Sequence, residues 1–321
     1  MRVNLLERLG GHFHTIAPFA RHVLRPGRVP PSRPWQIALA DPVHGRVSLT
    51  GRLHTLPGAK RILLVVHGLG GSADSHYVGA AVRAAVDAGM ACLRINLRGA
   101  DRSGDDFYHA GLSSDLASVV ESLGDYAAIH VLGYSLGGHV SLRLATETRD
   151  PCVRSVAAIC SPLDLDRCAH EIDRMASYVY RRHVLIGLRE MYAAYAARRS
   201  AIIPLAEATR IGTIREWDDR IVARRHGFDD VSHYYAEASV APRLRRLRVP
   251  ALLVASEHDP MVPAHTVRPA LTAASRLDVR WIRRGGHVGF PAEVSLGLPG
   301  PAGLEAQVVA WLQENQADLP G

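Results

Sequence analysis

The feature that most constrains the fold of this chain is a glycine-framed serine directly after an apolar run. Residues 127–132 (AAIHVL) form the run, and residues 133–138 (GYSLGG) follow it without a break. In this G-x-S-x-G arrangement a strand turns sharply into a helix, and small residues two positions either side of the serine let the backbone segments pass closely. Ser135 then projects from the carboxyl edge of a sheet as a candidate nucleophile. The alternative is a glycine-rich turn whose serine only caps the next helix.

Apolar runs and helical segments alternate on both sides of this turn. The continuous apolar run at 62–66 is typical of a strand that is covered on both faces. The alternation predicts an α/β fold with a mostly parallel central sheet and helices on both faces. The expected strands are 35–40, 46–50, 62–66, 91–95, 127–132, 153–159, 251–255 and 277–282, and the expected helices are 76–88, 112–123, 139–148, 266–274 and 304–312.

The interval 164–248 interrupts this alternation, because it is rich in arginine, tyrosine and helix formers and contains no clear strand. We interpret it as a helical cap that overhangs the strand ends where ligands bind; the alternative is a set of peripheral helices that pad the sheet edge. The predicted organisation is an N-terminal extension at 1–34, a first part of the core at 35–163, the cap at 164–248 and a second part of the core at 249–321.

Charge and composition limit the partners of the chain. The net charge is +7, Lys60 is the only lysine, and the arginines are scattered rather than clustered, which argues against a nucleic-acid partner. Contact with an anionic membrane surface remains an alternative, since 3–24 could include an amphipathic helix that touches lipid. Packing of that helix on the domain is the other interpretation.

The cysteines and the N-terminal segment indicate a reducing compartment. The four cysteines form no C-x-x-C pair and have mostly apolar neighbours, so we expect free thiols. Residues 1–28 lack the uninterrupted apolar core of a secretory signal, and no apolar run is long enough to cross a bilayer. The expected location is cytoplasmic.

A serine nucleophile needs a base and an acid that orients it. His287 lies in 285–290 (GGHVGF), a glycine-framed loop after the last apolar strand, and is the predicted base. Asp259 follows the strand at 251–255 and stands between the serine and the histidine, in the order of an α/β-hydrolase. Glu257 and Asp164 are alternative acids.

Backbone N–H groups should meet the negative charge that develops on the substrate oxygen. One predicted donor is Leu136, the residue after the nucleophile, and the other is Leu69 in the glycine-rich loop 67–72 (HGLGGS), with Gly70 as its alternative. We expect His67 to be a structural hydrogen-bonding group. Arg98 orients the acyl-binding loops or pairs with a nearby carboxylate; the alternative is that it is merely solvated.

The sequence contains no phosphate-binding loop of the G-x-x-x-x-G-K type and no H-E-x-x-H pattern. We therefore predict neither a cofactor nor a metal ion. A serine at the elbow also argues against the aspartate nucleophile of epoxide and haloalkane hydrolases.

Six motifs occur in one order along the chain and carry a family resemblance. They resemble the YheT-like branch of the α/β-hydrolases, which is related to the esterases and lipases of the abhydrolase group. The likeness extends over about residues 35–312 and includes 214–219 (IREWDD) in the expected cap. The six motifs are HGLGGS at 67–72, NLRG at 96–99, YHAG at 108–111, GYSLGG at 133–138, HDP at 258–260 and GGHVGF at 285–290.

The resemblance implies a carboxylic-ester hydrolase that works through an acyl-enzyme, with Ser135, Asp259 and His287 as its triad. The implied substrates are acylglycerols or short- to medium-chain acyl esters. One departure is His258, which stands where an acidic residue is frequent in the family. A thioesterase or amidase of the same fold remains an alternative, as does a noncatalytic hydrolase-fold binding protein, and the residues leave the oligomeric state open.

Overall fold

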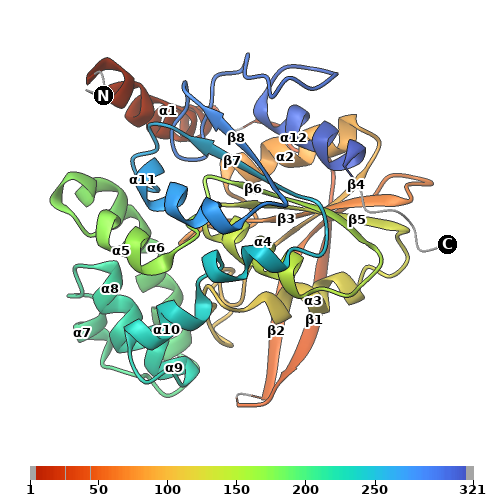
Figure 1. The fold of residues 1–321 in the computed structure, drawn as a ribbon. Helices are drawn as coiled ribbons and strands as arrows, with labels where there is room; N and C mark the ends of the chain where they lie inside the picture. Colours follow the sequence, from red (N-terminus) through yellow and green to blue (C-terminus); the bar gives the residue numbers. More distant parts are fainter. Residues whose placement is uncertain (1–4, 26, 44, 316–321) are drawn as a thin grey trace.

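The computed structural model describes residues 5–25, 27–43 and 45–315, and an eight-stranded sheet forms its centre (Figure 1). The order of the strands across the sheet is β1-β2-β4-β3-β5-β6-β7-β8. The strands are β1 (Arg33–Asp41), β2 (Gly45–His54), β3 (Arg61–Val66), β4 (Ala91–Ile95), β5 (Ala128–Tyr134), β6 (Val153–Ile159), β7 (Ala251–Ser256) and β8 (Leu277–Ile282).

Most of this sheet is parallel. Strands β3 to β8 pair in parallel, whereas β1 pairs antiparallel with β2 and β2 pairs antiparallel with β4. The carboxyl ends of the six parallel strands therefore meet at one edge of the sheet, where α/β proteins bind ligands. The predicted α/β-hydrolase architecture with a mostly parallel sheet is confirmed.

Helices cover both faces of the sheet. Helices α2 (His76–Asp87) and α12 (Leu304–Glu314) pack against one face, and α3 (Ser113–Glu121) and α4 (Leu136–Glu147) lie on the other. The central strands β3, β5 and β6 read as almost uninterrupted apolar runs and are buried along nearly their whole length. A strand that is covered on both faces needs this pattern.

The chain between β6 and β7 folds into helices that stand beside the sheet edge, at the lower left of Figure 1. This interval corresponds to the segment 164–248, whose role as a cap stays a prediction. Its described elements are α5 (Leu165–Ile172), η1 (Met175–Ser177), α6 (Tyr178–Ala196), α7 (Leu205–Ala208), α8 (Ile214–Trp217), the π-helical η2 (Asp218–Ala223), α9 (Arg224–His226), α10 (Val231–Ala238) and η3 (Ala241–Arg246).

One predicted helix is wrong in its extent. The expected α-helix at 266–274 is a short α-helix, α11 (Ala264–Val267), followed by a 3₁₀ segment, η4 (Arg268–Ala273). Pro269 explains the break, because proline has no N–H and its ring clashes with the preceding turn of an α-helix.

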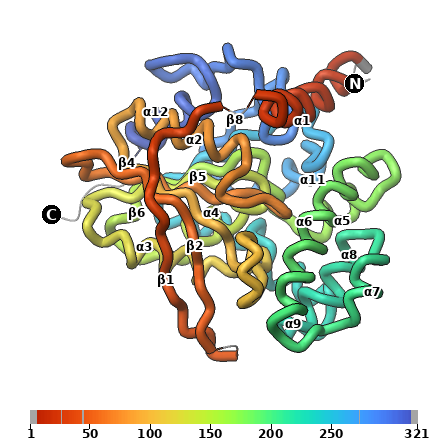
Figure 2. Tube along the Cα trace, turned by 180° about the vertical axis from the view of Figure 1, so that it is seen from behind, coloured from red at the N-terminus to blue at the C-terminus, as the bar shows by residue number. Residues whose placement is uncertain are grey.

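Helix α1 (Leu5–Leu24) precedes the sheet and lies at the same end of the molecule as α11 (Figures 1 and 2). Of the helices in the described part of the chain, none combines the length and the apolar character needed to span a membrane. The predicted N-terminal extension at 1–34 and the second part of the core at 249–321 are described only in part. Residues 1–4 and 316–321 lie outside the described residues.

Candidate active site

Ser135 occupies the tight turn between β5 and α4. Its φ angle is 51°, in the left-handed region that most residues avoid. The Ser135 N–H donates to the carbonyl of Ile159 at 2.8 Å, so β6 helps to hold this strained backbone. A Cβ atom on Gly133 would collide with the backbone of Gly137, which explains the glycine at that position. The sequence and the neighbouring strand together present the hydroxyl at the sheet edge.

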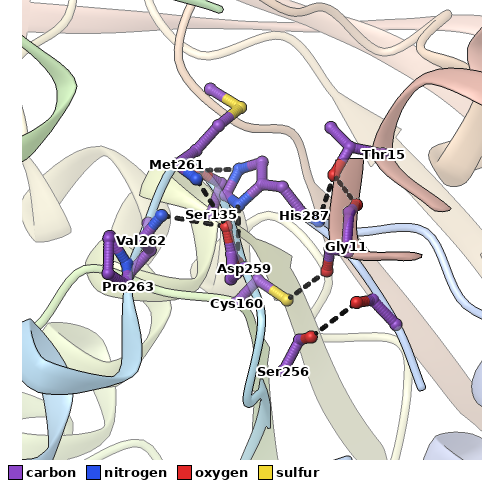
Figure 3. Close-up of polar contacts among 12 residues, drawn as sticks. Gly11, Thr15, Ser135, Cys160, Ser256, Asp259, Met261, Val262, Pro263 and His287 are labelled. Carbon is purple, nitrogen blue, oxygen red and sulfur yellow. Dashed lines mark hydrogen bonds and ion pairs between the residues drawn. The ribbon is translucent and has the colours of Figure 1, made fainter. Parts of the chain in front are cut away.

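His287 lies between Ser135 and Asp259 (Figure 3). Its Nε2 atom is 3.0 Å from Ser135 Oγ, and its Nδ1 atom is 2.9 Å from Asp259 Oδ2 and 3.1 Å from Oδ1. An ionised carboxylate can only accept, so Nδ1 carries the hydrogen and the neutral Nε2 accepts from the Ser135 hydroxyl. The three residues predicted to act together thus form one continuous chain of hydrogen bonds.

Asp259 is itself held in place by the turn that follows β7. Its Oδ1 atom accepts the N–H groups of Met261 at 2.8 Å and Val262 at 2.9 Å (Figure 3). The side chain is almost fully buried. These bonds leave the carboxylate little freedom, so it can fix the orientation of the His287 ring.

The two alternative acids lie elsewhere. Glu257 pairs with Arg268, with its two oxygens 2.8 and 2.6 Å from Nη2. Asp164 caps α5 by accepting the N–H of Arg167 and also contacts the Arg167 guanidinium. Neither carboxylate forms a hydrogen bond with His287, which leaves Asp259 as the acid on the imidazole.

The loop that carries His287 is fastened to α1. Thr15 Oγ1 accepts the backbone N–H of His287 at 2.8 Å and donates to the carbonyl of Gly11 (Figure 3). The backbone of α1 approaches so closely that a Cβ on Gly11 would overlap the carbonyl of His258, and one on Gly286 would overlap Thr15. Sequence reasoning did not find this role for Thr15, because the two residues are 272 positions apart.

Cys160 is a second residue that sequence reasoning missed. It follows β6 with a φ of 51°, and its Sγ atom, one Asp259 oxygen and one His287 nitrogen lie within 4.8 Å of one another (Figure 3). Burial raises the pKa of the Cys160 thiol well above its usual value, and the neighbouring Asp259 charge adds to this. The thiol is therefore neutral. The two groups beside it, Asp259 and His287, are already paired with each other by a hydrogen bond. All four cysteines of the chain are free.

The glycine-rich loop after β3 is shaped by two tyrosine hydroxyls. Tyr77 accepts the N–H of Gly68 at 3.0 Å, and Tyr108 accepts the N–H of Gly70 at 2.8 Å. Gly70, the alternative oxyanion donor, is therefore already engaged. The N–H of Leu69 between them forms no hydrogen bond with any described residue, which leaves it available to a ligand.

The N–H of Leu136, the first residue of α4, lies next to Ser135 and likewise has no partner among the described residues. His67 is fully buried and has a structural role, as the sequence predicts. Its Nδ1 atom is 2.8 Å from the Gly68 carbonyl, and its Nε2 atom accepts the N–H of Leu97 at 3.0 Å. Burial lowers the pKa of His67 to about 4, so the imidazole stays neutral at pH 7.

Arg98 is buried rather than solvated. Its guanidinium binds Asp115 through two bonds of 2.6 and 3.0 Å, and it also contacts Asp106 at 2.9 Å and Asp41 at 2.6 Å. Asp106 in turn pairs with Arg225 of α9. This network connects the antiparallel edge of the sheet, α3 and the helices between β6 and β7, so the interpretation of Arg98 as a charge-pairing residue is correct.

A cavity of about 640 Å³ opens beside Ser135. Its wall is formed by the loop after β3, by α1 and by helices between β6 and β7. The side chains from α5 and α6 that line it are mostly apolar, such as Ala169, Ile172, Leu188 and Met191. Its size is that of an ordinary small-molecule site.

The cavity wall contains one unusual acid, Asp218, at the start of the π-helical segment η2. Its Oδ2 atom accepts the hydroxyl of Tyr235 at 2.8 Å. Burial raises the pKa of this carboxyl to about 7, with Asp173 contributing further. π-Helical turns often occur at functional sites. The wall as a whole is mostly apolar, and its polar residues include Asp218 and the histidines His76, His109 and His183.

Three comparisons with known proteins agree with this architecture. The sequence profile described as "Alpha/beta hydrolase family" matches residues 63–295. That span is more than two thirds of the chain and includes Ser135, Asp259 and His287. The chain belongs to the α/β-hydrolase family.

Within that family the chain is YheT-like. It is 31% identical over 265 residues to YheT of Escherichia coli (strain K12), whose name proposes an esterase; the match covers 78% of this chain and 76% of YheT. It is 24% identical over 240 residues to phospholipase ABHD3 of Homo sapiens, covering 71% of this chain but 58% of that protein. The chain is therefore similar in sequence to hydrolases of the esterase and lipase type.

Solved structures match the fold at lower sequence identity. The esterase Pf2001 of Pyrococcus furiosus superposes with a TM-score of 0.53 at 16% identity, over 80% of this chain and 85% of that one. The 2,6-dihydroxy-pseudo-oxynicotine hydrolase superposes with a TM-score of 0.57 at 17% identity, over 89% of this chain and 68% of that one. At these identities the likeness concerns the fold alone.

Proposed function

We propose that this protein is a serine hydrolase that cleaves carboxylic esters through an acyl-enzyme. The observation that carries the proposal is the chain of hydrogen bonds from Asp259 through His287 to Ser135. This chain ends at a hydroxyl that faces an apolar cavity. A serine, a histidine and a buried carboxylate in this order are the groups that acyl transfer requires.

In the proposed reaction, Ser135 Oγ attacks the ester carbonyl carbon while its proton moves to Nε2 of His287. The Asp259 carboxylate stabilises the imidazolium that forms. The carbonyl oxygen becomes an oxyanion and accepts the N–H groups of Leu69 and Leu136, which have no other described partner.

The tetrahedral intermediate then collapses. The bond to the alcohol oxygen breaks, and the alcohol leaves with the proton from Nε2. Water attacks the acyl carbon as it gives a proton to the same nitrogen. The second intermediate releases the carboxylic acid, and Ser135 recovers its proton.

The cavity favours esters with apolar acyl chains. Its lining from α5 and α6 offers contact area and few hydrogen bonds to an acyl chain. Relatives named phospholipase ABHD3 and, in Saccharomyces cerevisiae, monoacylglycerol lipase support acylglycerols as one substrate class. This chain spans 58% and 55% of those two proteins, so their activities enter here only as part of the proposal.

The nucleophile is tested by comparing Ser135→Ala with Ser161→Ala. Ser161 is a buried serine near the same sheet edge whose hydroxyl has no hydrogen-bond partner among the described residues. We expect Ser135→Ala to lower kcat on p-nitrophenyl acyl esters by roughly 10⁴-fold or more, while Ser161→Ala keeps it within about threefold. Retained turnover in Ser135→Ala would reject the assignment.

Two alternatives are separated by further measurements. A fluorophosphonate should label the wild type stoichiometrically and leave Ser135→Ala unlabelled; absence of labelling in the wild type would support a noncatalytic binding protein. An ester, a thioester and an amide with one common acyl chain should rank by kcat/KM in that order of preference if the proposal holds. A thioester or amide at the top would reassign the reaction without moving the residues.

A further inference from the structure

Helix α1 has two sides that meet very different surroundings. On one side, Gly11 packs against His258, and Thr15 binds the backbone of His287. Glu7 pairs with Arg283 at 2.8 Å and anchors the start of the helix. The helix is therefore fixed in orientation by the loops of the candidate active site.

The other side of α1 is apolar and exposed. Four apolar residues of α1 are spaced by four, three and seven positions, which places them on one face of the helix. They are Leu9, Phe13, Ile16 and Val23. Phe13 is 64% exposed and Val23 is 63% exposed. A soluble surface seldom exposes several large apolar side chains side by side without a function.

This apolar face continues onto η1 and the start of α6. Met175 is 80% exposed and Val179 is 68% exposed, and Tyr178 between them is half exposed. Phe19 of α1 contacts the ring of His183 of α6 at 5.5 Å between centroids, so the two helices are neighbours here. We call the exposed apolar side chains of residues 9–24 and 175–179 the α1–α6 face.

The cavity reaches the surface within the α1–α6 face. Ile16, Phe19 and Val179 line the cavity, and the same three side chains are substantially exposed to solvent. A substrate that enters between them passes directly from this face to the interior. The mouth of the site and the exposed apolar side chains are thus one surface.

Basic residues border the α1–α6 face. Residues 5–25 contain three arginines and one glutamate. Arg8, Arg21, Arg25 and Arg182 are exposed; Arg174 is also exposed but pairs with Glu171 at 3.3 Å. An apolar face with a basic border is complementary to an anionic bilayer, where apolar side chains enter the acyl boundary and arginines contact the headgroups.

We propose that the α1–α6 face docks this protein onto the surface of an anionic lipid bilayer, with the cavity mouth turned toward the lipid. A second copy of the chain is a poorer occupant. In a two-fold contact the same patch faces itself, so the arginines of both copies would repel, and the cavity mouth would be closed. A bilayer instead neutralises the arginines and can supply apolar substrate directly to the mouth.

The test is co-sedimentation of the full chain with vesicles of phosphatidylcholine, with and without phosphatidylglycerol. We expect binding to the anionic vesicles, weaker binding to the neutral ones and a decrease at high salt. Phe13→Glu combined with Val23→Glu should weaken binding by about tenfold or more, and Arg21→Glu combined with Arg25→Glu should do the same. None of these four residues lines the cavity.

Val43→Glu is the matched control. Val43 is as exposed as the residues of the α1–α6 face but lies in the β1–β2 hairpin, away from α1 (Figure 1), and this variant should bind like the wild type. Thermal unfolding of each variant identifies any that fails to fold. The binding measurement needs no turnover, so its outcome is independent of the proposed esterase activity.

Three results would overturn the inference. The wild type could remain in the supernatant with anionic vesicles, or the glutamate variants could sediment as well as the wild type. Light scattering could also show a wild-type dimer that Phe13→Glu with Val23→Glu converts to monomer, which would assign the face to a second copy of the chain.

Discussion

The sheet edge and the cavity wall are built in different ways, although both surround Ser135. At the sheet edge, each candidate catalytic group follows a strand by a few residues, and hydrogen bonds from its own or an adjacent loop orient it. The wall is assembled mainly from α1, α5, α6 and the segment 214–222. Helix α1 is far from the others in sequence, and it meets them through packing and through hydrogen bonds such as the one between His12 and the Tyr180 hydroxyl. The candidate chemistry thus depends on local backbone geometry, and the space for the acyl chain depends on long-range contacts.

The largest expected effect tests the sheet edge. Asp259→Asn should lower kcat by about 10⁴-fold, because an amide no longer fixes the required tautomer of His287 or stabilises its cationic form. Glu257→Gln, which removes a nearby carboxylate that pairs with Arg268, should change kcat by less than about threefold. Steady-state kinetics on one ester checks both variants, and equal losses would show that Asp259 has no special role.

The role of the cavity wall in holding the acyl chain is tested by a substitution in α5, for which we expect a smaller effect on activity. Ala169→Phe places a ring into the cavity from α5 and should lower kcat/KM for long acyl esters by roughly 10- to 100-fold, while acetate esters keep most of their rate. His170→Phe adds the same ring to the exposed side of the same helix and should leave the chain-length profile unchanged. A chain-length series checks this; a uniform loss for all esters in Ala169→Phe would place the acyl chain elsewhere.

Thr15→Val tests the hydrogen bond that joins α1, in the cavity wall, to the loop that carries His287. The valine has the shape of threonine but cannot accept the N–H of His287, so we expect kcat to fall by about three- to tenfold through misplacement of the imidazole. Thr15→Ser keeps the acceptor and should recover most of the rate. If valine and serine behave alike, the hydroxyl does not position His287.

Asp218→Asn should affect stability more than turnover. Burial raises the pKa of Asp218 to about 7, above the roughly 3.9 of an exposed aspartate, so the folded state holds this proton more tightly than the unfolded state. The stability of the wild type should therefore decrease as the pH rises from about 4 to about 7 and remain lower above it. Asparagine cannot ionise and should remove this dependence.

Urea unfolding at pH 5 and pH 8 measures this difference. We expect Asp218→Asn to gain a few kcal/mol relative to the wild type between the two pH values. Asp229→Asn, at an exposed carboxylate, is the control and should follow the wild type. A constant offset of Asp218→Asn at both pH values would mean that Asp218 does not titrate in this range.

Much of the fold could be predicted because each strand is a local pattern. The apolar run at 62–66 and the turn at 133–138 contain within a few residues the information that places β3 and α4. The prediction lost accuracy where a single residue changes the outcome, as Pro269 does when it converts an expected helix into a 3₁₀ segment. The alternative that Arg98 is solvated was also wrong, because its three carboxylate partners lie on separate segments.

By itself, the sequence determined the order of Ser135, Asp259 and His287 and the loops on which they lie. Strained turns and glycine-framed loops depend on neighbouring residues, so a local sequence pattern is enough to predict them. Only the tertiary structure decided that Asp259 rather than Glu257 contacts His287, that Thr15 holds the histidine loop and that α1 borders the cavity mouth. These contacts join segments up to 272 residues apart. They form only when packing of the whole chain brings the segments together, and no local pattern specifies that packing.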